Sequence, residues 1–235
     1  MSREFEIRRE VELPATPEEV WQAATTSEGN AAWLFPNLVD PGDIRVSEPP
    51  HRFVVRTEGE NGSFNAIEDV IEARDGSTTV LRYVHSGILT DDWDNQYDAA
   101  DKHTDFYLHT LGQYLRHFKG RPATYVGGGP DGIVAPESSS AAGSLERLKR
   151  ALGVDGAAVG DTVTLDVDGL GPQEGVLDYA NEHFLGIRTG DALYRVFGRE
   201  RWGYGTAVSA HLFADDADEQ RTTEAWSAYL AKVFA

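Results

Sequence analysis

Few residues of this 235-residue sequence could carry out chemistry on a bound molecule. The chain contains no cysteine, which excludes a disulfide framework, a thiol nucleophile, a Cys-ligated zinc site and an iron–sulfur cluster. No His-Glu-x-x-His motif is present, and His109 and His117 lie two turns apart on one predicted helix, too far apart to ligate one metal ion. We therefore expect no metal site and no cofactor.

Two polar side chains are predicted to project inward from strands. Arg9 interrupts the mostly apolar face of Arg3–Leu13, so its guanidinium should meet a carboxylate, a histidine or an acidic ligand group. At the rim of the sheet it would pair with a neighbouring glutamate instead. His85 shares a face with Leu81 and Tyr83, where it could anchor a ligand, shuttle a proton or simply hydrogen-bond a backbone group.

Other polar clusters have a structural explanation. Aspartates gather around the start of a predicted long helix, at Asp91, Asp92, Asp94, Asp98, Asp101 and Asp105. They complement the positive end of the helix dipole and do not form a calcium-loop pattern. Gly127–Gly129 lacks the rest of a phosphate loop, and Ser138–Ser140 lacks the elbow of a serine hydrolase. The sequence thus favours binding over catalysis, leaves an enzyme open and identifies no catalytic residue.

The charge of the chain limits its partners. Asp and Glu number 39 against 21 Lys and Arg, a net charge of −18, and the acidity is spread over both halves. Nucleic acids and anionic membranes require basic surfaces, so we expect neither as a partner. Residues 1–12 lack the apolar core of a signal peptide, and no apolar run approaches the roughly 20 residues of a membrane span. We expect a cytoplasmic protein.

The first half contains the elements that must position Arg9 and His85. Alternation predicts a strand at Arg3–Leu13, and Thr16, Pro17 and Glu19 form a capping box that starts a helix. Further strands are predicted at His51–Thr57, Ser63–Ala73 and Thr78–Ser86, and a long amphipathic helix at Asp92–Phe118. A long helix with an apolar stripe must bury that stripe on the sheet.

The second half repeats the order of helix, strands and terminal helix. We predict a domain at 1–120, a linker at 121–143 and a second α+β domain at 144–235. The second domain begins with a short helix at Ser144 and ends with a helix from Asp218 to Phe234. Its strands are predicted at Thr162–Asp168, Gln173–Ala180, His183–Arg188, Ala192–Phe197 and Gly203–Phe213.

Three segments of the first half carry a resemblance to a known family: 13–21 (LPATPEEVW), 33–36 (WLFP) and 83–87 (YVHSG). Over about Arg3 to Phe118 the chain resembles the START/Bet v1-like (SRPBCC) superfamily, in particular the branch named after the activator of Hsp90 ATPase homologue. Residues 185–199 look like a second segment found in some bacterial two-part members. The resemblance implies an α+β helix-grip fold, a curved antiparallel sheet wrapped around a long C-terminal helix. It also implies an apolar cavity, and we expect a second, reduced helix-grip-like half to follow.

The function implied is binding of a small hydrophobic molecule (lipid-like, aromatic or polyketide-like) by a carrier or sensor. A cyclase or dehydratase using the same cavity and a co-chaperone-like module with a protein partner are the alternatives. Large aromatic residues either fill the interior or line the pocket. The residues expected to bind the ligand are Arg9, Trp21, Trp33, Phe53, Phe64, Tyr83, His85, Trp93, Tyr97, Tyr107 and Leu111.

Overall fold

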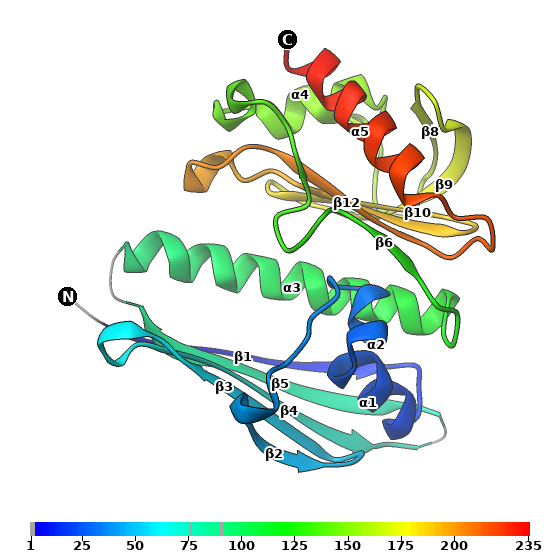
Figure 1. Cartoon of the computed structure of the whole chain (residues 1–235). Coiled ribbons are helices and arrows are strands. Elements are labelled where there is room, and N and C mark those ends of the chain that lie inside the picture. The colour runs from blue at the N-terminus through cyan, green and yellow to red at the C-terminus, as the bar shows by residue number, and fades with distance from the viewer. Residues whose placement is uncertain (1–2, 76, 90–91) are drawn as a thin grey trace. The chain divides into compact units, whose positions relative to one another are not determined.

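The chain forms two units, Met1–Arg121 and Pro122–Ala235, each built from an antiparallel sheet and a few helices (Figure 1). The computed structural model describes residues 3–75, 77–89 and 92–235. No helix within these ranges is both long and apolar enough to cross a membrane. The architecture is α+β and is compatible with a helix-grip fold.

The sheet of the first unit has the order β1-β5-β4-β3-β2. Its strands are β1 (Arg3–Leu13), β2 (Ile44–Glu48), β3 (Arg52–Glu58), β4 (Phe64–Ala73) and β5 (Thr79–Leu89). The first strand pairs with the last, in a register that sets Arg9 opposite Tyr83 and Ile7 opposite His85. Because side chains alternate along a strand, this register fixes which residues of the central strands face the helices.

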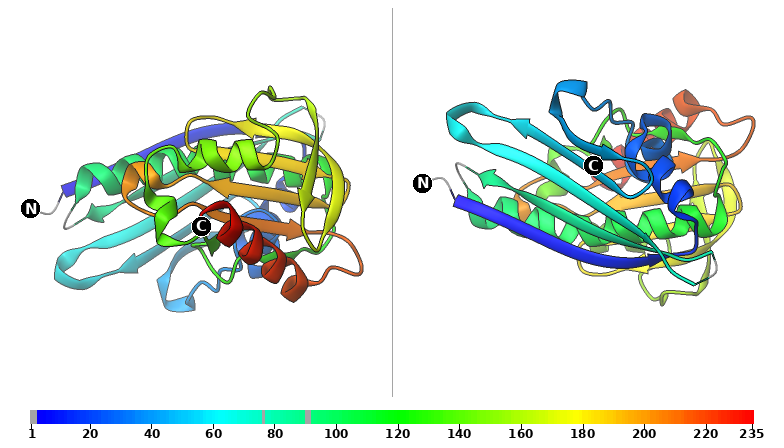
Figure 2. Two further views of the ribbon diagram at one scale, coloured as in Figure 1. Left: turned by 90° about the horizontal axis from the view of Figure 1, so that it is seen from above. Right: turned by 90° about the horizontal axis from the view of Figure 1, so that it is seen from below.

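Three helices complete the first unit: α1 (Pro17–Thr25), α2 (Ser27–Ala31) and α3 (Trp93–His117). The predicted capping box starts α1, with Thr16 accepting from the Glu19 amide and Glu19 accepting from the Thr16 amide. Gly29 lets α2 approach α1 closely, since a Cβ at this position would meet the backbone of Gln22 and Ala23. Helix α3 runs along one face of the sheet and contacts β1 (Figures 1 and 2).

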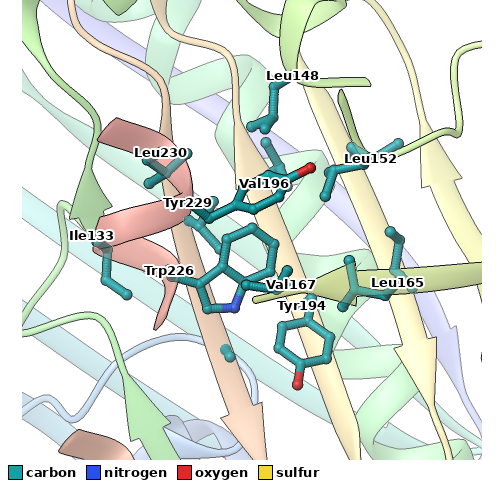
Figure 3. Close-up of a cluster of buried hydrophobic side chains, with 14 of the residues drawn as sticks. Ile133, Leu148, Leu152, Leu165, Val167, Tyr194, Val196, Trp226, Tyr229 and Leu230 are labelled. Carbon is teal, nitrogen blue, oxygen red and sulfur yellow. The ribbon is translucent and has the colours of Figure 1, made fainter. Parts of the chain in front are cut away.

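The second unit has a sheet in the order β6-β12-β11-β10-β9-β8, with β7 also paired to β12. Its strands are β6 (Thr124–Val126), β7 (Ile133–Val134), β8 (Thr162–Val167), β9 (Gly171–Ala180), β10 (Phe184–Thr189), β11 (Ala192–Phe197) and β12 (Ala207–Leu212). Helices α4 (Ser144–Ala151) and α5 (Glu219–Val233) cover one face of this sheet (Figure 1). The core between them contains Leu148, Tyr194, Trp226 and Leu230 (Figure 3).

The two sheets share an ordering rule. In each, the first strand of the unit pairs with the last, and the other strands follow in descending order. The exception is β7 of the second unit, which pairs with β12. Each unit also places a helix between its early strands and a longer helix after its last strand. A reduced helix-grip-like second half nevertheless stays a prediction.

Residues 121–143 differ from the predicted linker. This stretch contains β6 and β7, both hydrogen-bonded to β12, and a 3-10 turn at Glu137–Ser140. Its glycines and serines suggested a flexible connection, but short edge strands need only a few residues whose backbone groups find partners. Strand β2 was not predicted either, because its alternation extends over just five residues.

Candidate functional site

The first unit contains a cavity of about 460 Å³. Its walls come from β3, β4, β5, α3, the end of α1, α2 and the segment that follows α2. The lining residues are Ala24, Asn30, Trp33, Leu34, Phe35, Asn37, Val39, Phe53, Val55, Thr57, Asn65, Ile67, Asp69, Leu81, Tyr83, His85, Ala100, His103, Thr104, Tyr107, Leu108 and Leu111. The volume lies within the usual range for small-molecule sites.

Aromatic and aliphatic side chains form most of the cavity wall. Phe53 and Trp33 are both largely buried, each with 7% of its surface exposed. The Trp33 indole is fixed because Nε1 donates to the Ala23 carbonyl at 2.9 Å. The cavity therefore has rigid apolar walls, where burial of a ligand's hydrocarbon surface is favourable.

A single carboxyl group lies in this cavity. Asp69 is in the middle of β4, opposite Phe53 of β3 and Tyr83 of β5, and only 6% of its surface is exposed. In the part of the chain that the structure describes, no hydrogen bond or ion pair holds its side chain. Burial, with a smaller contribution from the charge of Glu68, raises the pKa of Asp69 to about 7.

Hydroxyl groups line the same cavity, on Tyr83, Thr104 and Tyr107. Burial raises the pKa of Tyr83 well above its ordinary value, as do the nearby Asp69 and Tyr107, whereas a hydrogen bond with Thr104 opposes this shift. The Thr104 hydroxyl also donates to the Ala100 carbonyl at 2.8 Å. Tyr83 is thus a neutral phenol at physiological pH, and its hydroxyl group adds to the polar side chains of the cavity wall.

His85 is a second polar group on the same strand as Tyr83. Its Nε2 lies 2.6 Å from Asn65 Oδ1, an acceptor, so this nitrogen carries the proton. The ring also packs edge-on against Phe5, with centroids 4.9 Å apart. Burial lowers the pKa of His85 to about 4, so the imidazole is uncharged at neutral pH.

The structure brings part of the predicted ligand-binding set together. Trp33, Phe53, Tyr83, His85, Tyr107 and Leu111 line the cavity. Arg9, Trp21, Phe64, Trp93 and Tyr97 are not among the lining residues.

Arg9 points to α3 instead of the cavity. Its guanidinium donates to Asp101 Oδ1 at 2.7 Å and to Asp105 Oδ1 at 2.5 Å, which ties β1 to α3. The prediction that the arginine needs a carboxylate partner is confirmed, but the partners are aspartates of the helix and not a ligand. Burial alone would raise the pKa of Asp101, but the hydrogen bonds and charges of Arg9 and Lys102 together outweigh burial and keep that pKa below its usual value. Asp91, from the same predicted cluster, lies outside the described residues.

The other aromatic residues away from the cavity have partners of their own. Trp93 stacks on Tyr97, with ring centroids 4.7 Å apart. Trp21 packs edge-on against Phe53 at 5.6 Å. Phe64 lies on the opposite face of β4 from Asn65, Ile67 and Asp69, and the Arg56 guanidinium covers its ring at 3.5 Å. Phe64 was predicted from its size, although alternation along β4 places it outside.

Asp69 is the residue of the candidate site that the sequence prediction missed. The signal was present in the alternation of β4, since Ile67, Asp69 and Ile71 share one face of the strand. An aspartate between two isoleucines on a buried face is unusual and marks an inward carboxyl. The neighbouring Glu68 obscured it, because two adjacent acids suggest a solvated strand.

Metal binding has no support within the described ranges, where no three His, Asp or Glu side chains gather closely enough to hold an ion. A separate hollow in the second unit, at the start of α5, is lined by Asp216, Asp218, Glu219 and neighbouring residues. It is open to solvent and has no enclosing apolar wall, so the cavity of the first unit is the better candidate site.

Comparison with known proteins gives a fold likeness. No protein-family model matches the sequence, and a search of curated proteins finds no match. The Aha1 dimer from Colwellia psychrerythraea is 19% identical, with 49% of this chain and 99% of that one covered and a TM-score of 0.40. An AHSA1-like protein from Rhizobium etli is 23% identical, with coverage of 51% and 86% and a TM-score of 0.39. DynU16, a protein of the dynemicin biosynthetic locus, is 19% identical, with coverage of 96% for both chains and a TM-score of 0.39.

Structures from the AHSA1-like branch that the sequence resembles are thus among those similar to this chain. At these identities and TM-scores the function has to be inferred from the cavity itself.

Proposed function

We propose that the first unit binds a small, largely apolar molecule in its cavity, as a carrier or sensor. The observation that supports this most is the 460 Å³ cavity with aromatic walls and a carboxyl group inside it. A structural core would be filled by its own side chains, as the core around Trp226 in the second unit is (Figure 3). Lipid-like, aromatic and polyketide-like molecules are the ligand classes that suit these walls.

The affinity would come from apolar burial. Removing about 200 Å² of ligand hydrocarbon from water is worth roughly 5 kcal/mol at about 25 cal/mol per Å². The loss of translational freedom on binding opposes this gain, so polar contacts must add to it for tight binding. Asp69, Tyr83 and Thr104 are the groups placed to supply such contacts.

Fluorescence titration with N-phenyl-1-naphthylamine, a neutral apolar probe, tests this function. Two adjacent valines of β3 provide a matched pair of variants, because Val55 lines the cavity and Val54 faces the other side of the strand. The wild type and Val54→Trp should bind the probe, and Val55→Trp should lose most of the affinity because the indole fills the cavity. Equal binding by the two variants, or no binding by the wild type, would contradict the proposal.

An enzyme acting in the same cavity is the second candidate function. The observation in its favour is Asp69, whose pKa of about 7 suits general acid–base catalysis at neutral pH. His85 would be a second group, while Arg9 is held by aspartates of α3. Once a substrate that the protein converts is known, loss of turnover without loss of substrate binding in Asp69→Asn or His85→Ala would support catalysis. A co-chaperone-like role would show instead as a stoichiometric protein partner.

We also propose that the second unit is the reduced helix-grip-like half. The shared strand order and the helix after the last strand of each unit support this. Its helices cover a core filled by Tyr194, Trp226 and Leu230, so the proposal includes no second apolar site there.

A further inference from the structure

We propose that the ligand of this cavity carries a basic nitrogen, and that its ammonium group pairs with the carboxylate of Asp69. The inference rests on the proposed binding function and names the chemical class of the ligand, an apolar body bearing a protonated amine.

The Asp69 carboxyl group is buried without a hydrogen-bond donor or a cation among the described residues. The side chain lines the cavity with 94% of its surface buried, since 6% is exposed, and no described residue donates a hydrogen bond to it. A buried carboxylate without a donor or cation is unfavourable by several kcal/mol or more, so such groups are normally paired. A group left in this condition and aimed into a cavity is complementary to a donor that arrives with the ligand.

The groups around Asp69 include no basic side chain of lysine or arginine among the described lining residues. The titratable groups that face Asp69 into the cavity are Tyr83 and His85 from β5 and His103 and Tyr107 from α3. The Glu68 carboxylate lies on the other face of β4, where Arg52 Nε donates to it at 2.8 Å. Neither lysine nor arginine is among the described residues that line the cavity. The described lining therefore offers one acidic side chain and no lysine or arginine to pair with it.

The chemistry of the cavity walls also favours a cation with an apolar body. The rings of Trp33, Phe53 and Tyr83 line the cavity with Asp69, and aromatic rings attract cations as well as apolar groups. An amine with an apolar body would satisfy both the rings and the carboxylate. A carboxylate ligand would be repelled by Asp69, and a neutral hydrocarbon would leave it without a partner.

Protonation links the affinity to pH. Burial holds the pKa of Asp69 at about 7, so below that pH the carboxyl group must release a proton before it pairs with an ammonium ion. The affinity for an amine should therefore rise by up to about tenfold per pH unit as the pH approaches 7 and level off above it.

Three probes with one ring system separate the outcomes: 2-(2-naphthyl)ethylamine, 2-(2-naphthyl)ethanol and 2-naphthylacetic acid. Their dissociation constants are measured by calorimetry with the full chain between about pH 5 and pH 8.5. We expect the amine to bind at least about tenfold more tightly than the alcohol at pH 7.5, as for a desolvated ion pair, with the acid weakest.

Two variants of β4 assign the effect to Asp69. Asp69→Asn keeps the shape of the side chain and should remove both the preference for the amine over the alcohol and the pH dependence of that preference. Glu68→Gln removes the same charge from the outer face and should keep the preference. His103 is unchanged in all three proteins, so a contribution from this side chain is common to them and does not affect the comparison.

Each other outcome overturns the inference in an identifiable way. If the alcohol binds and the amine binds no more tightly, the cavity is a binding site but not one for a basic nitrogen. If the preference for the amine persists in Asp69→Asn, the preference comes from the net negative charge of the chain and not from Asp69. If none of the three probes nor N-phenyl-1-naphthylamine binds, the proposed function fails together with the inference.

Discussion

At the scale of single residues, Asp69 has opposite effects on folding and on binding. Burial raises its pKa from 3.8 to about 7, so the folded protein binds a proton that the unfolded chain releases. Its contribution to the free energy of unfolding is complete below about pH 4 and is lost as the pH rises through 7. The native state thus keeps a group that opposes its own stability at neutral pH, as is common at functional sites.

Replacement of Asp69 by asparagine should increase stability at alkaline pH. One pKa unit is worth about 1.4 kcal/mol, so the wild type should lose up to about 4 kcal/mol between pH 4 and pH 7 that Asp69→Asn does not lose. Urea unfolding of both proteins at pH 4.5 and pH 8 measures the difference, with Glu68→Gln as the control. A pH profile identical in the wild type and Asp69→Asn would contradict the buried, unpaired carboxyl.

His85 should titrate in the opposite sense. Burial lowers its pKa to about 4, so its contribution to stability is present above its unfolded pKa and is lost as the pH falls through 4. NMR titration of the ring, assigned with His85→Gln, should find the midpoint below pH 5. A midpoint near the ordinary value of about 6.5 would show an exposed imidazole.

At the scale of elements, the ion pair of Arg9 joins the first strand to the long helix. The Arg9 side chain is 27% exposed and that of Asp101 is 20% exposed, so screening by water reduces the strength of the pair. We expect Arg9→Met to lower the free energy of unfolding by about 1–2 kcal/mol and to leave probe affinity unchanged. Arg82→Met provides the control, because Arg82 pairs with exposed glutamates on the outer face and its loss should have a smaller effect than that of Arg9. Loss of probe binding in Arg9→Met would restore the predicted ligand role of this arginine.

The second sheet depends on a glycine beside a buried ion pair. Arg195 donates to both oxygens of Asp178 at 2.9 Å, and a Cβ on Gly186 would overlap this pair. Gly186→Ala should therefore destabilise the chain by about 2–4 kcal/mol, as expected when a buried ion pair is disturbed. Gly190→Ala is the matched control because its Cβ would enter open space. Thermal unfolding distinguishes the two, and equal midpoints would contradict the packing of this pair.

How far the sequence predicts these elements depends on how local their signals are. Strand β1 has the predicted bounds, and the Thr16–Glu19 capping box forms as predicted, because both patterns lie within one element. Residues 121–143 contain two strands that the sequence did not predict, because β6 and β7 exist through pairing with residues of β12 that follow 73 to 88 positions later. The site was predicted from residue size, which selected Phe64 and Trp93, whereas strand register decides which side chains face inward. Asp69 could have been found from that register alone.

At the scale of the whole molecule, we expect ligand binding in only one of the two units. The cavity is in the first unit, while the cluster around Trp226 fills the space between helices and sheet in the second. Titration of the full chain with N-phenyl-1-naphthylamine should therefore saturate at one probe per chain. Two equivalent sites would show that the second unit also opens a cavity.

The excess of acidic residues is also a property of the whole molecule. Several glutamates on the outer face of β1 pair with arginines, such as Glu10 with Arg82 and Glu12 with Arg74, and these exposed pairs contribute little stability. The net charge of −18 therefore acts mainly through the surface, where it attracts cationic molecules and repels anionic ones. If Asp69 binds a cationic ligand, the cavity and the negatively charged surface of the protein favour the same class of ligand.

A crystal structure of the full chain with 2-(2-naphthyl)ethylamine is the most direct test of whether an ammonium group pairs with Asp69 in the cavity. We expect the naphthyl ring between β3, β5 and α3, with the nitrogen within about 3 Å of an Asp69 carboxyl oxygen. A cavity closed by its own side chains, or an amine bound elsewhere with Asp69 still unpaired, would contradict it.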